Sequence, residues 1–173
     1  PDGFKMTIHG PNDRYINDAK IAEALAQMLN RVGIEASVET MPKAVYFKRA
    51  SRGGPNKSPE FSFMLLGWGA GSGEASSPLK ALLHTYDKSK GLGAANRGRH
   101  SDAEVDKLVK QALATVDADA RGALLAKATE KAVGENYGVI PMHYQVNTWA
   151  AKAGYKYLPR TDERTIVTGL SGS

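Results

Sequence analysis

The order of hydrophobic patterns in the first 66 residues constrains the fold more than any other feature of the sequence. Apolar and polar residues alternate over 4–9 and again over 34–40, and an apolar helical face lies between them. A short helical pattern follows Pro42, and the run "FSFMLL" at 61–66 is strongly apolar. Alternation is typical of strands and a period of 3.6 of amphipathic helices. The β–α–β–α–β order predicts an α/β fold with a mixed, mostly parallel sheet flanked by helices.

Capping residues set the expected ends of the first helix. Asn17 or Asp18 can accept a hydrogen bond from its first turn, and Gly33 stands where a C-terminal glycine is expected. The apolar face of this helix is expected to consist of Ile21, Leu25, Met28, Leu29 and Val32.

The second half of the chain is expected to be mainly helical. One helix should run from about 75–78 to His84, and Ser101 with Glu104 matches a capping box at the start of another. Asp117 or Asp119 can cap the next helix, which Gly134 is expected to end. Residues 138–157 have a strand-like pattern, in which Pro141 marks an edge, a strand start or a bend.

Composition excludes several classes of protein. The 173 residues suit one ordinary domain, and the absence of cysteine excludes disulfides, thiolate catalysis and Cys-ligated zinc. No apolar run approaches the ~20 residues that span a bilayer. The chain has neither an initial Met nor a signal-peptide pattern, so we expect it to be a piece of a longer protein.

Catalytic motifs are weak. The four histidines form no metal-binding pair such as HExxH, "GSGEAS" is not GxSxG, and no Lys-Ser/Thr follows the glycines to make a P-loop. We therefore predict no catalytic residue, metal or cofactor. One alternative stays open, an α/β hydrolase-like enzyme that uses Glu74 with His84 or His143.

A second alternative is a basic nucleic-acid-binding domain, because the net charge is +5. The charge is spread along the chain, and its aromatic residues are scattered over different predicted elements rather than interleaved with basic ones. The arginines that would make such a surface are Arg49, Arg52, Arg97 and Arg99.

The stretch "FMLLGWGAGSGEASS" places Trp68 at the end of the third predicted strand, among glycines. Trp68 could close the core there, or it could form a flat platform in a ligand cleft beside exposed backbone. Glu74 could attract a cationic ligand or stabilise the N-terminus of the next helix. Asn96, with Arg97 and Arg99 before a capped helix, could bind phosphate or carboxylate, or the three could belong to a solvated loop.

Four segments together resemble one family. They are "GFKMTIHGPNDRYINDAKIAEALAQMLNRVGIEASVETM", "FSFMLLGWGA", "NRGRHSDAEVDKLVKQALATVDADARGALLAKATEKAV" and "VIPMHYQVNTWAAKAG". In this order they resemble the C-terminal part of the family 5 extracellular solute-binding proteins. These are the dipeptide- and oligopeptide-binding components of ABC importers.

The resemblance implies a type II periplasmic-binding-protein-like lobe. Residues 1–173 would form one α/β lobe of a two-lobe protein, with 148–173 returning towards the missing N-terminal lobe. The partners would be a peptide or another small molecule and an ABC permease in the inner membrane, with no nucleic acid. The protein would be periplasmic, exported by a signal peptide outside this chain, and it would not be an enzyme.

The resemblance also implies a site. Trp68 and Gly69 match ligand-contacting positions, and Gln145 matches a position that faces the cleft. Asn147 has the same strand parity as Gln145, so we expect it on the same side. Gly71 stands where peptide-binding relatives commonly carry an Asp for the ligand's amino terminus. Glu74, Asn96 and Gly71 complete the predicted ligand-binding set, and the ligand's identity stays open.

Overall fold

The computed structural model describes residues 3–71, 73–160, 162 and 164–172. The chain divides into two compact units, Pro1–Ile140 and Pro141–Ser173, and each is described by itself. The assignment of residues 1–173 to one lobe, with 148–173 as a return segment, stays a prediction.

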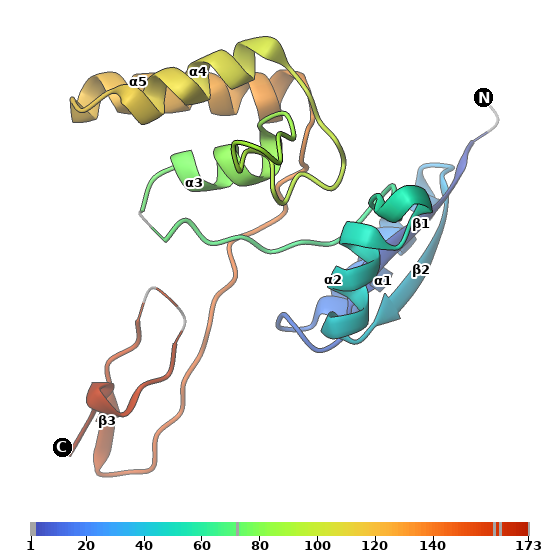
Figure 1. The fold of residues 1–173 in the computed structure, drawn as a ribbon. Coiled ribbons are helices and arrows are strands. Elements are labelled where there is room, and N and C mark those ends of the chain that lie inside the picture. The colour runs from blue at the N-terminus through green and yellow to red at the C-terminus, as the bar shows by residue number, and fades with distance from the viewer. Residues whose placement is uncertain (1–2, 72, 161, 163, 173) are drawn as a thin grey trace. The chain divides into compact units, whose positions relative to one another are not determined.

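The first unit begins with a parallel strand pair joined by a helix (Figure 1). In this pair, His9 of one strand lies opposite Glu39 of the other, and the connecting helix packs on both strands. The elements are β1 (Lys5–Pro11), α1 (Asp18–Arg31), β2 (Glu35–Met41) and α2 (Lys43–Arg52), followed by the 3-10 turn η1 (Pro55–Lys57). The two predicted strands and both helices are confirmed.

The ends of α1 follow the sequence in part. Gly33 has φ +88°, and its amide donates to the carbonyl of Asn30, as predicted for a C-terminal glycine. Asn17 occupies the N-cap position, but its side chain caps nothing. The Asp18 carboxylate accepts from the amide of Ala19 in the first turn, as predicted, and also from the amides of Arg14 and Tyr15 in the preceding loop.

The predicted face of α1 is confirmed in part, since Leu25 and Leu29 pack, partly buried, against the core of this strand pair. Met28 and Val32 are 59% and 74% exposed, whereas Ala22 and Ala26 are buried against Ile8 of β1. Alanines allow the helix to approach the sheet closely, so the buried stripe lies one step round the helix from the largest side chains.

The third predicted strand is reduced to a single parallel bridge between His9 and Met64. The amide of His9 donates to the carbonyl of Phe63, and that of Leu65 donates to the carbonyl of His9. The segment is therefore parallel to β1, as predicted, but the ladder goes no further along it.

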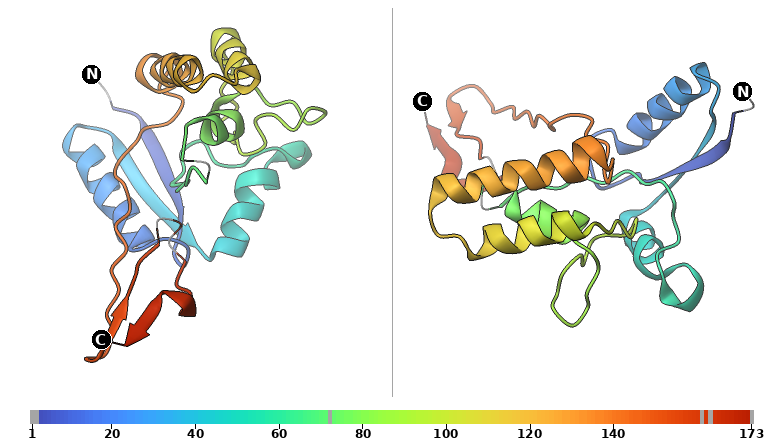
Figure 2. Two further views of the ribbon diagram at one scale, coloured as in Figure 1. Left: turned by 90° about the vertical axis from the view of Figure 1, so that its left-hand side faces the viewer. Right: turned by 90° about the horizontal axis from the view of Figure 1, so that it is seen from above.

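The helical part of the first unit comprises α3 (Ser76–Pro78), the π-helical turn η2 (Leu79–Leu83), α4 (Ala103–Ala114), α5 (Ala118–Thr129) and the π-helical turn η3 (Glu130–Glu135). Figure 2 shows α4 and α5 side by side. Their core is formed by Leu79, Leu83, Val105, Val109, Ala112, Leu125, Ala128 and Ala132.

The starts of α4 and α5 settle two predictions. The capping box at Ser101 is wrong, because Asp102 is the N-cap and its carboxylate accepts from the amides of Glu104 and Val105. Asp117 caps α5, which leaves Asp119 in its first turn. The helix also continues through Gly134 as η3, so that residue does not end it.

The second unit holds one small antiparallel pair, β3 (Tyr155–Tyr157) with β4 (Leu170–Gly172), and the 3-10 turn η4 (Val167–Gly169). The predicted strand pattern over 138–157 is therefore confirmed only at its end. The indole of Trp149 donates to the Thr165 hydroxyl and lies against Tyr157. Within the residues that the structure describes, no helix is both long and apolar enough to cross a membrane.

Candidate ligand-binding site

Trp68 lies on an open turn at the end of the bridged segment. Its side chain is 45% exposed, so the indole does not close the core. A Cβ added at Gly69 or Gly71 would meet no atom within 4 Å. The turn therefore presents a half-exposed aromatic face beside backbone that no side chain covers.

Two tyrosine hydroxyls hold the chain just before this turn. The Tyr46 hydroxyl, on α2, donates to the carbonyl of Leu65 at 2.7 Å, and burial raises the pKa of this phenol. The Tyr15 hydroxyl donates to the carbonyl of Gly67 at 3.3 Å. A Cβ at Gly67 would lie 2.7 Å from the Tyr15 ring, so a larger residue at this position would have to displace that ring.

Glu74 has protein partners in the structure. Its carboxylate pairs with the Arg121 guanidinium at 3.0 Å and accepts from the Ser76 hydroxyl. The pairing raises the pKa of Arg121, chiefly through the hydrogen bond to Glu74. The carboxylate thus links the start of α3 to α5, and its predicted contact with a ligand stays a prediction.

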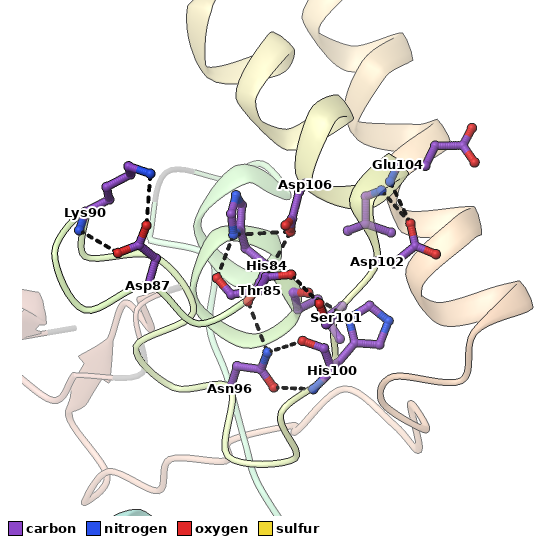
Figure 3. Close-up of polar contacts among 12 residues, drawn as sticks. His84, Thr85, Asp87, Lys90, Asn96, His100, Ser101, Asp102, Glu104 and Asp106 are labelled. Carbon is purple, nitrogen blue, oxygen red and sulfur yellow. Dashed lines mark hydrogen bonds and ion pairs between the residues drawn. The ribbon is translucent and has the colours of Figure 1, made fainter.

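Asn96 is buried, with 3% of its surface exposed, and its amide organises a loop (Figure 3). Its Nδ2 donates to the carbonyls of His84 and His100, at 3.0 and 2.7 Å, and its Oδ1 accepts from the amide of His100 at 2.9 Å. Every strong polar function of the side chain therefore has a backbone partner. The structure gives Asn96 a structural role that competes with its predicted contact with a ligand.

The same loop holds a buried histidine. His84 Nδ1 lies 2.8 Å from the carbonyl of Thr85 and 3.2 Å from Asp106 Oδ1, and its buried Nε2 has no hydrogen-bond partner among the described residues. Because both neighbours of Nδ1 are acceptors, that nitrogen carries the proton. His84 is thus paired with Asp106, whereas the hydrolase alternative needs Glu74 beside a histidine.

Gln145 and Asn147 lie in the second unit. Gln145 Nε2 donates to Asn147 Oδ1 at 3.0 Å, which agrees with their expected position on one side of the chain. Both side chains are partly buried. Tyr144, just before them, is 97% exposed, and Val146, between them, is 77% exposed. This alternation has the period of a strand although no ladder forms there.

Three of the four arginines proposed for nucleic acid are engaged within the protein. Arg49 pairs with Glu39 and Glu60, at 2.6 and 2.5 Å. Arg97 donates to the Ser51 hydroxyl, and the Arg99 guanidinium lies 4.0 Å from the Tyr86 ring centre. These contacts do not favour a free basic face.

No group of three or more His, Asp or Glu that could hold a metal occurs among the described residues. A shallow hollow of about 410 Å³ is lined by Ser76, Ser77, Lys80, Ala81, Gly91, Ala94 and Leu113. It does not include Trp68. The half-exposed indole therefore lies outside this hollow, and its place in a ligand site stays a prediction.

Comparison with known proteins identifies the fold. The chain is similar to the periplasmic binding protein DppA of Helicobacter pylori, solved with the peptide STSA, at 24% identity and a TM-score of 0.65 over 80% of this chain and 25% of that one. It is similar to OppA of Haemophilus influenzae, solved with the peptide RPPGFSPFR, at 25% identity and a TM-score of 0.69 over 89% and 28%.

HbpA2 of Haemophilus parasuis matches the whole chain and 33% of its own length, at 20% identity and a TM-score of 0.75. The structural neighbours of this chain are family 5 solute-binding proteins. The chain thus has the α/β fold of a type II periplasmic binding protein and spans about a quarter to a third of these neighbours. No family model and no curated protein matches it.

Sequence reasoning missed Tyr15 and Tyr46, which hold the approach to Trp68. One signal was present, since Pro11 follows closely on the predicted strand and cannot donate a backbone hydrogen bond. A backbone carbonyl of the segment beside β1 that lies next to Pro11 therefore needs a donor from another residue.

Proposed function

We propose that this chain is part of the substrate-binding component of an ABC-type peptide or oligopeptide uptake system and forms one wall of its ligand cleft. The observation that carries the proposal is the half-exposed Trp68 on an uncovered glycine turn, in a fold shared with proteins solved in complex with peptides. Trp is enriched where binding energy is concentrated, because it offers a large rigid surface.

The proposed site contains Trp68, Gly69 and Gly71, with Glu74, Asn96, Gln145 and Asn147 as further predicted contacts. An extended peptide can pair with exposed backbone while its side chains enter tolerant pockets. The bare backbone at Gly69 and Gly71 suits such pairing. No carboxylate occupies position 71, so a peptide's ammonium group needs an acid elsewhere, or the ligand has no free amine.

We further propose that the protein is a periplasmic receptor without enzymatic activity. Its structural neighbours are binding proteins. A ligand would bridge this wall and a second, N-terminal lobe and favour the closed state by its differential affinity. The closed form would then deliver the ligand to an inner-membrane permease.

The test begins with the complete gene product that contains this chain. It is purified without denaturation, and the small molecules released on unfolding are identified by mass spectrometry. We expect peptides or a related small molecule. The amount of ligand recovered from the Trp68→Ala variant should be lower by about tenfold or more, because an anchoring aromatic side chain is lost.

The matched control is Trp149→Ala, which removes the other tryptophan of the chain. Equal ligand recovery from the Trp68→Ala variant and the unmodified protein would contradict the proposed wall. Separately, the 173-residue chain alone should bind peptides weakly in calorimetry, since one wall supplies only part of the contacts. Tight binding by that chain would contradict a cleft shared with a second lobe.

A further inference from the structure

The chain before Trp68 depends on a ladder that stops early. Odd-numbered residues of β1 face the bridged segment, since the amide of His9 donates to Phe63 and its carbonyl accepts from Leu65. In a parallel ladder the next bond would run from residue 11 to the carbonyl of Leu65. Residue 11 is Pro11, which has no amide hydrogen. The ladder is chemically blocked at that step.

Side-chain hydroxyls donate hydrogen bonds to the carbonyls that lack a donor from the neighbouring strand. The buried Tyr46 hydroxyl reaches Leu65 O at 2.7 Å, where the Pro11 amide would have been. Two residues on, the Tyr15 hydroxyl reaches Gly67 O at 3.3 Å. Residues 65 and 67 have the same parity, so the two hydroxyls continue the row of donors along one edge of the segment.

The placement of Tyr15 is itself fixed by the loop between β1 and α1. The buried Asp18 carboxylate accepts from the amides of Arg14 and Tyr15, at 2.9 and 3.0 Å. The absence of a Cβ at Gly67 then lets the Tyr15 ring lie against the backbone. A chain of contacts thus runs from Asp18 through Tyr15 to the residue before Trp68.

We propose that Tyr15 and Tyr46 are positioning residues for the Trp68 turn, because their hydroxyls replace the strand donors that Pro11 cannot supply. The importance of this positioning for ligand binding rests on the proposed function. The positioning itself is a property of the chain without ligand. A side-chain hydroxyl can break its hydrogen bond to a carbonyl without breaking any backbone hydrogen bond between strands. The turn can therefore shift while the two tyrosines still favour one orientation.

The first measurement follows Trp68 directly. In the 173-residue chain carrying Trp149→Phe, Trp68 is the remaining indole, and its fluorescence quenching by acrylamide is recorded. Trp68 is already 45% exposed, so full exposure of its indole after loss of the Tyr15 hydrogen bond can raise the quenching constant by at most about twofold. We expect Tyr15→Phe to move it towards that limit. The control Tyr155→Phe, an exposed tyrosine of the second unit, should leave it unchanged.

The second measurement assigns each bond. The ¹³C resonance of a backbone carbonyl moves upfield when a hydrogen bond to it is lost. With carbonyl-labelled leucine and glycine, Tyr46→Phe should move Leu65 and not Gly67, and Tyr15→Phe the reverse. A merely stabilising role would move neither carbonyl selectively.

Unchanged quenching in Tyr15→Phe, or an equal change in Tyr155→Phe, would overturn the role of Tyr15. An unmoved Leu65 carbonyl in Tyr46→Phe, or an unfolded Tyr46→Phe chain, would overturn the role of Tyr46. Neither result touches the proposed function, whose own failure would be a gene product that releases no ligand. The two proposals therefore fail in different experiments.

Discussion

Two loops of the first unit were both predicted to touch a ligand, and the structure treats them in opposite ways. The Trp68 turn leaves its indole 45% exposed and its glycines uncovered. The loop around Asn96 buries that side chain to 3% exposure and uses its amide on three backbone groups. The difference separates a loop that can offer contacts from one whose polar groups are already paired.

The contrast has a physical cause. A buried backbone carbonyl or amide must find a partner, and an irregular loop has no ladder to provide one. Asn can supply donors and an acceptor at once, so one side chain satisfies the Asn96 loop from within. The Trp68 turn is glycine-rich and open, so water can satisfy its backbone.

The largest expected effect is on stability at Asn96. Asn96→Ala strands the carbonyls of His84 and His100 and the amide of His100, so we expect the free energy of unfolding to fall by about 2–4 kcal/mol. Urea denaturation measures it. Asn12→Ala, at an exposed loop position, is the control and should stay within about 0.5 kcal/mol. Equal effects of the two substitutions would erase the distinction between the loops.

A smaller effect should separate two glycines of the Trp68 turn. Gly67→Ala places a Cβ 2.7 Å from the Tyr15 ring and should cost about 1–3 kcal/mol, since the ring must move. Gly69→Ala meets nothing within 4 Å and should stay within about 0.5 kcal/mol. Neither glycine has a positive φ, so the comparison isolates the contact with Tyr15. Equal losses at both positions would show that the turn is not held at Gly67.

Local periodicity predicted much of the fold. The alternation at β1 and β2 and the glycine at position 33 gave the correct strands and helix end, because such signals depend on neighbours in the sequence. The third strand was predicted in place and direction but not in extent. At one end of the bridge the next donor would be Pro11, which is more than 50 residues away in the sequence and has no amide hydrogen.

The candidate site was harder to predict because exposure is a tertiary property. Trp68 was equally compatible with a core position, and only the fold leaves it half exposed. Asn96 looked available next to Arg97 and Arg99, yet its partners His84 and His100 come together only in the folded loop. Glu74 pairs with Arg121, which lies 47 residues later on α5, and no local sequence pattern predicts this pairing.

The start of α4 sharpens the comparison further, since it borders the Asn96 loop. Asp102 accepts from two amides of the helix and from Asn136 Nδ2, and the backbone hydrogen bond from Val105 is the main reason that its pKa lies below the usual range. The Ser101 hydroxyl lies 2.8 Å from the Thr85 hydroxyl and not at an amide of the helix, within the residues that the structure describes. We expect Asp102→Ala to lower the thermal midpoint and Ser101→Ala to lower it less. The reverse order would restore the capping box predicted from the sequence.

The smallest effect should appear on acidification, at the approach to the Trp68 turn. Hydrogen bonds from Arg49 are the main cause that lowers the pKa of Glu39 and Glu60 from the ordinary value of 4.5. Groups whose pKa is lower in the folded state stabilise it fully above the unfolded value, and this contribution is lost as the pH falls through the folded value. The thermal midpoint should therefore decline below about pH 4.5, modestly because these ions are partly exposed and screened.

Glu60→Gln should make that decline shallower, since one of the two coupled carboxylates is gone. Glu23→Gln, on the exposed side of α1, is the control and should keep the slope of the unmodified chain. The neutral amide of Asn96 has no charge to lose over this range, so Asn96→Ala should shift the whole profile down without changing its slope. A shallower slope in Asn96→Ala than in Glu60→Gln would mean that charge, rather than amide pairing, holds the Asn96 loop.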